Sequence, residues 1–97
     1  MTTPTETPQV CHIPTAHRFE MLAEGHVAVL DYKLKGNIIT FTHTGVPAEL
    51  EGRGIGSQLA RAGLEYAREN AFQVISTCWF ITGYIERHKE YQSLLKV

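Results

Sequence analysis

The sequence has little cysteine, with two residues in 97, Cys11 and Cys78. A single disulfide between them stays possible, but two cysteines exclude the disulfide framework that stabilises small secreted domains. No CxxC pair and no pair of histidines stands at the spacing of a structural zinc site, so we expect no metal. At this length the chain is one small domain that can bury a single hydrophobic core.

An excess of charge of either sign is also missing, since nine basic and ten acidic residues give a net charge of −1. Domains that bind nucleic acid favour a basic stripe, so we expect no nucleic-acid partner. No apolar run is long enough to span a membrane, and the N-terminus lacks the basic-then-apolar pattern of a signal peptide. These absences favour a cytoplasmic globular protein without a membrane partner.

Residues 1–15 are rich in threonine and proline and lack apolar periodicity. We therefore expect a flexible N-terminal tail, followed by one domain over residues 16–97. Alternating apolar and β-branched residues predict three strands joined by short turns, over residues 18–22, 26–34 and 38–44. Strands joined in this way form an antiparallel meander.

The second half of the chain changes to helical periodicity. An apolar face recurs every three to four residues over 55–69, and Asn70 is able to end such a helix in the left-handed conformation. A short apolar strand over 73–77 and a second helix over about 80–88 follow. The predicted order is β-β-β-α-β-α, which is an α+β fold.

One motif points to chemistry, the run Gly52-Arg53-Gly54-Ile55-Gly56 directly before Ser57. Glycine lets the backbone turn tightly and present its amides to a ligand. The first helical turn adds unpaired N–H groups and the positive end of the helix dipole. The run therefore predicts a site for phosphate or pyrophosphate, although a glycine-rich turn of this kind is often only a turn.

The order of these features resembles the Gcn5-related N-acetyltransferase superfamily, and more closely its minimal branch of about one hundred residues. The superfamily's acetyl-CoA loop has the form Gln/Arg-x-x-Gly-x-Gly/Ala. The matching stretches run through the chain from Arg18 to Leu95, and they are Glu51-Gly52-Arg53-Gly54-Ile55-Gly56, His43-Thr44-x-Val46-Pro47, Val74-Ile75-Ser76-Thr77-Cys78 and Tyr84-Ile85-x-Arg87-His88-x-x-Tyr91. The resemblance implies a truncated acyl-CoA N-acyltransferase fold.

The chain departs from the superfamily pattern in three places. Glu51 stands where Gln or Arg is usual, which replaces a donor to pyrophosphate with a carboxylate, and Arg53 could compensate. Ser76 replaces a proline of the minimal branch. The chain also stops after its second helix, where larger members build much of the acceptor pocket. The acceptor site is therefore open, completed by a partner, or absent.

The resemblance implies acetyl-CoA as cosubstrate, with its pyrophosphate on the amides of the glycine loop and Ser57. The pantetheine arm would run beside the strand that ends at Thr77, which places the thioester near Cys78. Arg87 and His88 could approach the 3′-phosphate or adenine. They could equally be a solvated helix end that the dipole favours.

Three side chains are candidates for catalysis. Cys78 could carry the acetyl group as a thiolate, line the thioester pocket, or be a small buried hydrophobe. Tyr84 could protonate the departing CoA thiolate or pack its ring on the sheet. His43 has a suitable intrinsic pKa for a general base, but a lone strand histidine is more often a surface residue.

These observations lead to three hypotheses. The first is a minimal acetyl-CoA-dependent N-acetyltransferase with an unidentified amine acceptor, either a small molecule or a protein. The second is a CoA-binding module or subunit without catalysis. The third is a small α+β interaction domain whose glycine loop is merely structural. The uncovered sheet edges of so small a domain could also pair with a second copy or a partner protein.

Overall fold

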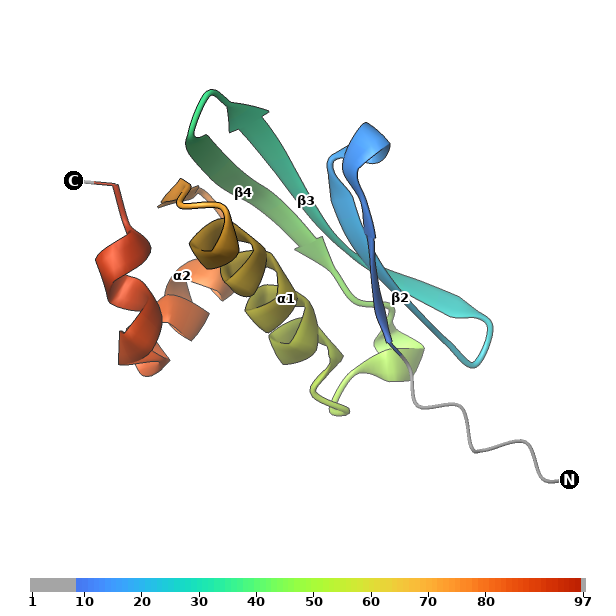
Figure 1. Ribbon diagram of the computed structural model, residues 1–97. Helices are drawn as coiled ribbons and strands as arrows, with labels where there is room; N and C mark the ends of the chain where they lie inside the picture. Colours follow the sequence, from blue (N-terminus) through green and yellow to red (C-terminus); the bar gives the residue numbers. More distant parts are fainter. Residues whose placement is uncertain (1–8, 97) are drawn as a thin grey trace, which may run out of the picture.

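The structure is a computed structural model that describes residues 9–96. It contains one sheet of five strands, and α1 lies across one face of that sheet (Figure 1). The strands and helices follow one another as β1 Val10–Ile13, β2 Arg18–Ala23, β3 His26–Lys35, β4 Ile38–Gly45, α1 Ile55–Glu69, β5 Gln73–Ser76 and α2 Trp79–Arg87. The described residues also contain three short 3₁₀ helices, η1 Pro14–Ala16, η2 Ala48–Leu50 and η3 Lys89–Leu94.

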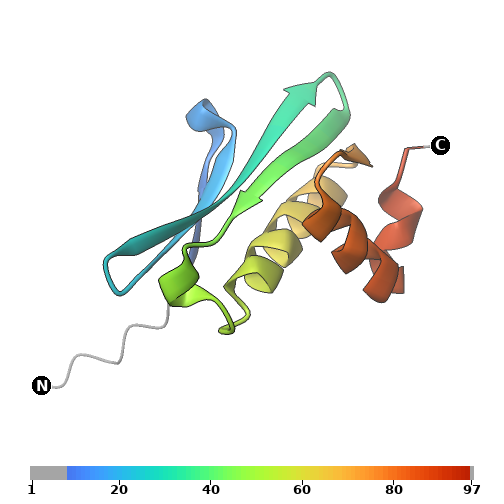
Figure 2. The same ribbon diagram turned by 180° about the vertical axis from the view of Figure 1, so that it is seen from behind.

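The strands lie in chain order across the sheet, from β1 to β5. Pairing is antiparallel from β1 to β4 and parallel between β4 and β5. The parallel pair needs a crossover, and α1 provides it by passing over the sheet. The view from behind shows α2 and η3 beyond α1, at the β5 end of the sheet (Figure 2). The α+β class, the antiparallel meander and the α-β-α ending are confirmed.

The N-terminal part of the chain differs from the sequence prediction. Residues 10–13 form β1, which pairs with β2 from Val10 opposite Met21 to Ile13 opposite Arg18. The expected tail over residues 1–15 is therefore wrong for its second half, and residues 1–8 lie outside the described residues. The strand was missed because its own four residues carry no clear alternation. It is stabilised by pairing with β2 and by the stacking of His12 on Phe19, with ring centroids 4.2 Å apart.

Helix α1 comes unusually close to the sheet at Gly63. A Cβ built on this glycine would lie 2.8 Å from Leu30 Cδ2 and 2.8 Å from Phe41 Cε1, and both neighbours are fully buried. The helix axis can therefore approach the strands only because this position has no side chain. The close approach fixes the position of the α1 N-terminus and of the glycine loop in front of it.

The end of α1 also differs from the prediction. Asn70 has φ of −104°, and the left-handed residue is the next one, Ala71, with φ of 57°. The Asn70 side chain instead donates to the Tyr66 carbonyl at 2.9 Å. The second helix begins at Trp79, with Cys78 as its N-cap, one residue before the predicted start.

Strand β4 contains a bulge that decides which of its side chains face the helices. Tyr32 pairs with Phe41 but Asp31 pairs with His43, so Thr42 is the extra residue. Before the bulge Phe41 faces the core, and after it Thr44, opposite the buried Leu30, takes the same face. His43 is moved to the open face of the sheet, beside Asp31.

Strands β4 and β5 diverge just after the bulge. Their pairing reaches Phe41 opposite Ser76, and the Thr77 amide then donates to the Phe41 carbonyl at 3.0 Å. Beyond that bond β4 continues to Gly45, whereas the segment that follows β5 turns at Cys78 into α2. The strands open into a gap whose edge on β4 is free of a neighbouring strand.

Within residues 9–96, no helix has the combination of length and apolar character needed to cross a membrane.

Candidate functional site

The glycine loop has the backbone conformation that its composition predicts. Gly52 and Gly54 have φ of 83° and 74°, in the left-handed region that residues with a side chain adopt only with strain. Gly54 is also the N-cap of α1, where its carbonyl accepts the Gln58 amide at 3.1 Å. The first amides of α1 are consequently left without helical partners and are available to an anion.

Gly56 serves a different purpose. It is buried in the first turn of α1, where a Cβ would lie 2.8 Å from the tip of the Phe80 ring. This glycine lets the beginning of α2 pack closely against the beginning of α1. Gly52 and Gly54 therefore shape the turn, whereas Gly56 allows α1 and α2 to pack closely together.

The loop forms one wall of a pocket of about 360 Å³. The opposite walls come from the end of β4, from η2 and from the start of α2. The lining residues are Thr44, Val46, Leu50, Glu51, Gly52, Gly54, Ile55, Gly56, Ser57, Trp79 and Phe80. The pocket thus joins the glycine turn to the gap between β4 and β5.

At that gap, Cys78 lies buried behind the pocket lining. Its sulfur is 3.5 Å from the hydroxyl oxygen of Thr44, which does line the pocket. Burial alone raises the pKa of the Cys78 thiol, but the Thr44 side chain and the amides of Ile81, Phe80 and Thr44 favour the thiolate, and the pKa is lowered overall. The sulfur is therefore separated from the pocket by the Thr44 side chain, and its hydrogen bonds lower the pKa of the thiol despite burial.

These features match known proteins. The family model described as GCN5-related N-acetyl-transferase matches residues 18–94, which is most of the chain. The chain belongs to the GCN5-related N-acetyltransferase family. Its relatives include Protein NATD1 of chicken and of human, each 39% identical over 62 residues. That match covers 63% of this chain and only 56% and 55% of those two proteins.

A solved structure shares the fold of this N-acetyltransferase family member. It is the NMR solution structure of a Staphylococcus aureus protein described as a candidate GCN5-like N-acetyltransferase. The two chains have a TM-score of 0.68 and 34% sequence identity, and the match covers 82% of this chain and 81% of the other. The small fold with a single α-β-α ending is therefore shared and is not peculiar to this sequence.

For an acetyltransferase family member, Arg53 has an unexpected position. Its guanidinium lies 2.5 Å from the carboxylate of Glu24, at the tip of the hairpin between β2 and β3. Arg53 is outside the pocket lining. Hydrogen bonding to Arg53 and its charge lower the pKa of Glu24. The guanidinium is therefore engaged elsewhere and does not replace the donor that Glu51 lacks.

His43 does not join Cys78 and Thr44 in this structure. The bulge turns its exposed side chain to the open face of the sheet, where its ring packs over Gly45. Thr77 also stays outside the pocket lining, because its amide and hydroxyl both turn to the Phe41 carbonyl, at 3.0 and 3.4 Å.

Tyr84 and Arg87 lie in the second half of α2 and His88 is its C-cap, and all three are outside the pocket lining. The Tyr84 ring is buried and stacks on His88 with centroids 3.8 Å apart. Burial is the main reason that the Tyr84 pKa is raised. Tyr84 therefore packs between α2 and η3, with its ring centroid 6.2 Å from that of Tyr91, and Arg87 is exposed at the helix end.

Several pocket residues were not predicted as site residues. They are Thr44, Val46, Leu50, Glu51, Trp79 and Phe80. Thr44 and Val46 belong to the motif that carried the resemblance, and Trp79 and Phe80 directly follow Cys78. Their closeness in sequence to the predicted site residues could have indicated them. The contact between Phe80 and Gly56, however, exists only because α1 and α2 cross in the folded structure.

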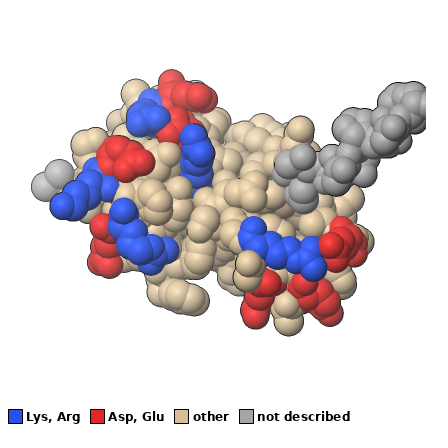
Figure 3. Space-filling model, turned by 90° about the horizontal axis from the view of Figure 1, so that it is seen from below, with Lys and Arg blue, Asp and Glu red and all other residues tan. Residues whose placement is uncertain are grey.

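The charge of the site is modest. Of the residues that the structure describes, Glu51 is the one with a charged side chain in the pocket lining. Figure 3 shows acidic and basic side chains interspersed on the face seen from below, without a broad patch of one sign. Across residues 9–96, no three His, Cys, Asp or Glu side chains gather in an arrangement that could hold a metal ion. Within this lining, only backbone amides and the helix dipole could therefore attract an anion to the loop.

Proposed function

We propose that this chain is a minimal N-acetyltransferase that uses acetyl-CoA to acetylate an amine. One observation carries the proposal: a single pocket joins an anion-binding turn at the N-terminus of α1 to the gap between β4 and β5, where Thr44 and Cys78 lie. Membership of the acetyltransferase family supports the same reaction class.

In this proposal the CoA pyrophosphate binds the amides of the Gly52–Gly56 loop and of Ser57. Each such bond is charge-assisted and so is stronger than a neutral hydrogen bond. Carboxylate repulsion from Glu51 opposes binding, but that side chain is exposed and its charge is screened by solvent. The pantetheine arm continues into the gap, where the free edge of β4 offers backbone groups beyond Phe41.

The acetyl thioester then lies near Thr44 and Cys78. In direct transfer, the amine nitrogen attacks the carbonyl carbon, the bond from that carbon to the CoA sulfur breaks, and the nitrogen loses a proton. In the alternative, the Cys78 thiolate attacks first and displaces CoA as a thiolate, and the amine then displaces the Cys78 sulfur. The lowered pKa of Cys78 is compatible with the second route and decides nothing between them.

A CoA-binding module without catalysis is the second candidate. It is favoured by the positions of His43 on the open face and of Tyr84 between the helices, because neither reaches the pocket lining. In that case CoA binds and no acetyl transfer occurs. A cytoplasmic location and pairing with a second copy or a partner protein stay predictions from the sequence.

Calorimetric titration of CoA and acetyl-CoA tests the proposal. We expect Gly54→Val to abolish binding, because valine at a φ of 74° must distort the turn. Gly36→Val is the matched control, since Gly36 has φ of 59° in the turn between β3 and β4 and is outside the pocket lining. If both variants stay folded and bind CoA as the native chain does, the loop is only a turn.

An acetylation assay with Cys78→Ala then distinguishes the candidates. Release of CoA that requires an amine establishes transfer, and its survival in the variant establishes the direct route. CoA binding without any amine-dependent release would leave the binding module.

A further inference from the structure

The hairpin between β2 and β3 ends in a two-residue turn with an unusual first residue. Ala23 pairs with His26, so Glu24 and Gly25 form the turn, and their φ angles are 51° and 77°. Two-residue hairpin turns with positive φ at both positions favour Asn, Asp or Gly. A glutamate adopts this left-handed conformation only with strain, since its Cβ crowds the backbone. The turn alone therefore gives no reason for glutamate at this position.

The Glu24 side chain makes a contact across the molecule instead. Its carboxylate accepts a hydrogen bond from the Arg53 guanidinium at 2.5 Å, between residues 29 positions apart in the chain. On the other flank of the turn, the His26 ring lies 3.9 Å from the Glu49 carboxylate in η2. The hairpin tip therefore contacts the chain on both sides of residues 50–51, which line the pocket.

Arg53 is the residue through which this contact reaches the glycine loop. It stands between Gly52 and Gly54, whose backbones lack the restriction that a side chain imposes. A Cβ built on either glycine would meet nothing within 4 Å, so packing against other elements does not hold the turn. A loop of this kind has many accessible conformations, and selecting one of them on binding costs entropy. Anchoring the side chain between the two glycines removes part of that cost before a ligand arrives.

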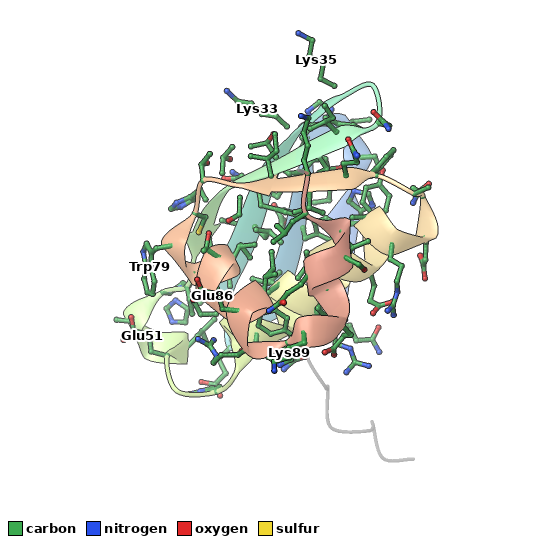
Figure 4. The ribbon with its side chains drawn as sticks, turned by 90° about the vertical axis from the view of Figure 1, so that its left-hand side faces the viewer. Lys33, Lys35, Glu51, Trp79, Glu86 and Lys89 are labelled. Atoms are coloured by element: carbon green, nitrogen blue, oxygen red, sulfur yellow. The ribbon has the colours of Figure 1, made fainter. Side chains whose placement is uncertain are left out.

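The arrangement of the loop amides matters because no cationic side chain assists them in the pocket. Arg53 is outside the pocket lining, and no Lys or Arg side chain belongs to the described lining. Figure 4 shows Glu51 and Trp79 at one side of the molecule, whereas Lys33 and Lys35 project from another edge. An anion in this pocket would therefore meet backbone amides, and the strength of its binding depends on how well they converge.

We propose that the contact between Glu24 and Arg53 braces the glycine loop and holds its amides in the arrangement that binds an anion. Glu24 is then a positioning residue, which acts through Arg53 and contacts no ligand itself. The strain of its left-handed backbone is the cost of placing a carboxylate at the hairpin tip. The identification of the anion as the pyrophosphate of CoA rests on the proposed function.

Removal of the Glu24 carboxylate distinguishes the brace from two alternatives. Loss of a negative charge near the loop would by itself strengthen anion binding, because like charges repel. Release of Arg53 to bind the phosphates directly would also strengthen it. Loss of the brace has the opposite effect, because the freed loop must be ordered when the ligand binds. The sign of the change in affinity therefore separates the brace from both alternatives.

Glu24→Asn is the decisive variant, because asparagine suits a left-handed turn position and leaves the hairpin intact. Calorimetric titration with CoA and, separately, with inorganic pyrophosphate measures the affinity. We expect binding to weaken roughly two- to five-fold, the range for an exposed ion pair, while the melting temperature is unchanged or higher. Glu69→Gln is the matched control, since it removes the same charge at the last residue of α1, about 20 Å from the loop along the helix. It should leave the affinity unchanged.

Arg53→Gln completes a double-mutant cycle. It should weaken binding about as much as Glu24→Asn, and the double variant should bind no more weakly than either single variant, because all three lose the same contact. Amide hydrogen exchange without ligand gives an independent measure. The amides of the loop around Arg53 should exchange faster in Glu24→Asn, whereas the amide of Gly36, in the turn between β3 and β4, should not change.

The outcomes separate this inference from the proposed function. Unchanged or tighter binding by Glu24→Asn would overturn the brace. A fall in melting temperature in step with the loss of affinity would also overturn it, since a residue that only supports the fold lowers both. If the native chain binds neither CoA nor pyrophosphate, the proposed function fails, and the exchange rates decide the brace alone. If the native chain binds CoA and Glu24→Asn changes neither affinity nor exchange, the brace fails and the proposed function stands.

Discussion

Replacing Gly63 with alanine sets two effects of known size against each other. In an exposed helix interior, Gly→Ala stabilises by about 0.8–1.0 kcal/mol, because glycine loses more backbone freedom on folding. At Gly63 the new Cβ would lie 2.8 Å from both Leu30 Cδ2 and Phe41 Cε1, whereas ordinary contacts begin at 3.4 Å. Each contact must therefore lengthen by about 0.6 Å.

The neighbours have little room to move, since Leu30 and Phe41 are both fully buried. Overpacking of this kind typically costs about 1–3 kcal/mol, so we expect it to outweigh the helix-propensity gain. The net loss should be about 1 kcal/mol, which lowers the melting temperature by roughly 4–8 °C in a domain of this size. Urea unfolding followed by circular dichroism measures the loss, and an unchanged m-value shows that the unfolded state is unaffected.

A double-mutant cycle with Leu30→Val tests the cause. Valine lacks the Cδ atoms that the new methyl group would meet, so Gly63→Ala should cost less in that background. A coupling of about 0.5 kcal/mol or more is expected for residues in contact. If Gly63→Ala instead stabilises the native chain by the full propensity gain, α1 lies farther from the sheet than the structure places it, and the argument for the position of the glycine loop fails.

Three further predictions concern other parts of the molecule. Burial lowers the pKa of His12, whose ring nitrogen lies 2.6 Å from the Tyr32 hydroxyl. The neutral imidazole therefore contributes stability above the pKa of about 6.5 that histidine has in the unfolded chain. This contribution is lost as the pH falls through the lowered pKa of the folded state. His12→Phe should flatten the dependence of the urea midpoint between pH 7.5 and 5, and an unaltered slope would contradict this. Ala71→Gly should stabilise by about 0.5–1 kcal/mol in thermal unfolding, because the residue is left-handed with φ of 57°, and a loss of stability would show that no strain is stored there. Thr44→Val should raise the pKa of the Cys78 thiol, seen as slower alkylation of the Cys78 peptide at pH 7 by mass spectrometry, whereas an unchanged pH profile would mean that the hydroxyl gives no support.

The local elements could be predicted because their signals are contained in short stretches of chain. The strands β2 to β4, the helix α1 and the turn at Gly54 follow from alternation, helical periodicity and the freedom of glycine to adopt positive φ. The resemblance through these motifs also identified the family correctly. Strand β1 was missed, because its four residues are ordered by their pairing with β2 and not by a pattern of their own.

The pocket depended on contacts between distant residues, which no local pattern contains. The bulge in β4 turns His43 to the open face and Thr44 toward Cys78, although both are adjacent in sequence. The ion pair of Arg53 with Glu24 likewise requires the hairpin tip to reach the glycine loop.

The sequence by itself determined the glycine turn before α1, because the left-handed conformations at Gly52 and Gly54 are a property of glycine and of its immediate neighbours. Only the tertiary structure decided what faces that turn. Packing of α2 on α1, through the contact of Phe80 with Gly56, brings Trp79 and Phe80 to the pocket that the glycine loop lines. That arrangement arises from close packing between elements distant in the chain, which depends on every side chain in the interface together.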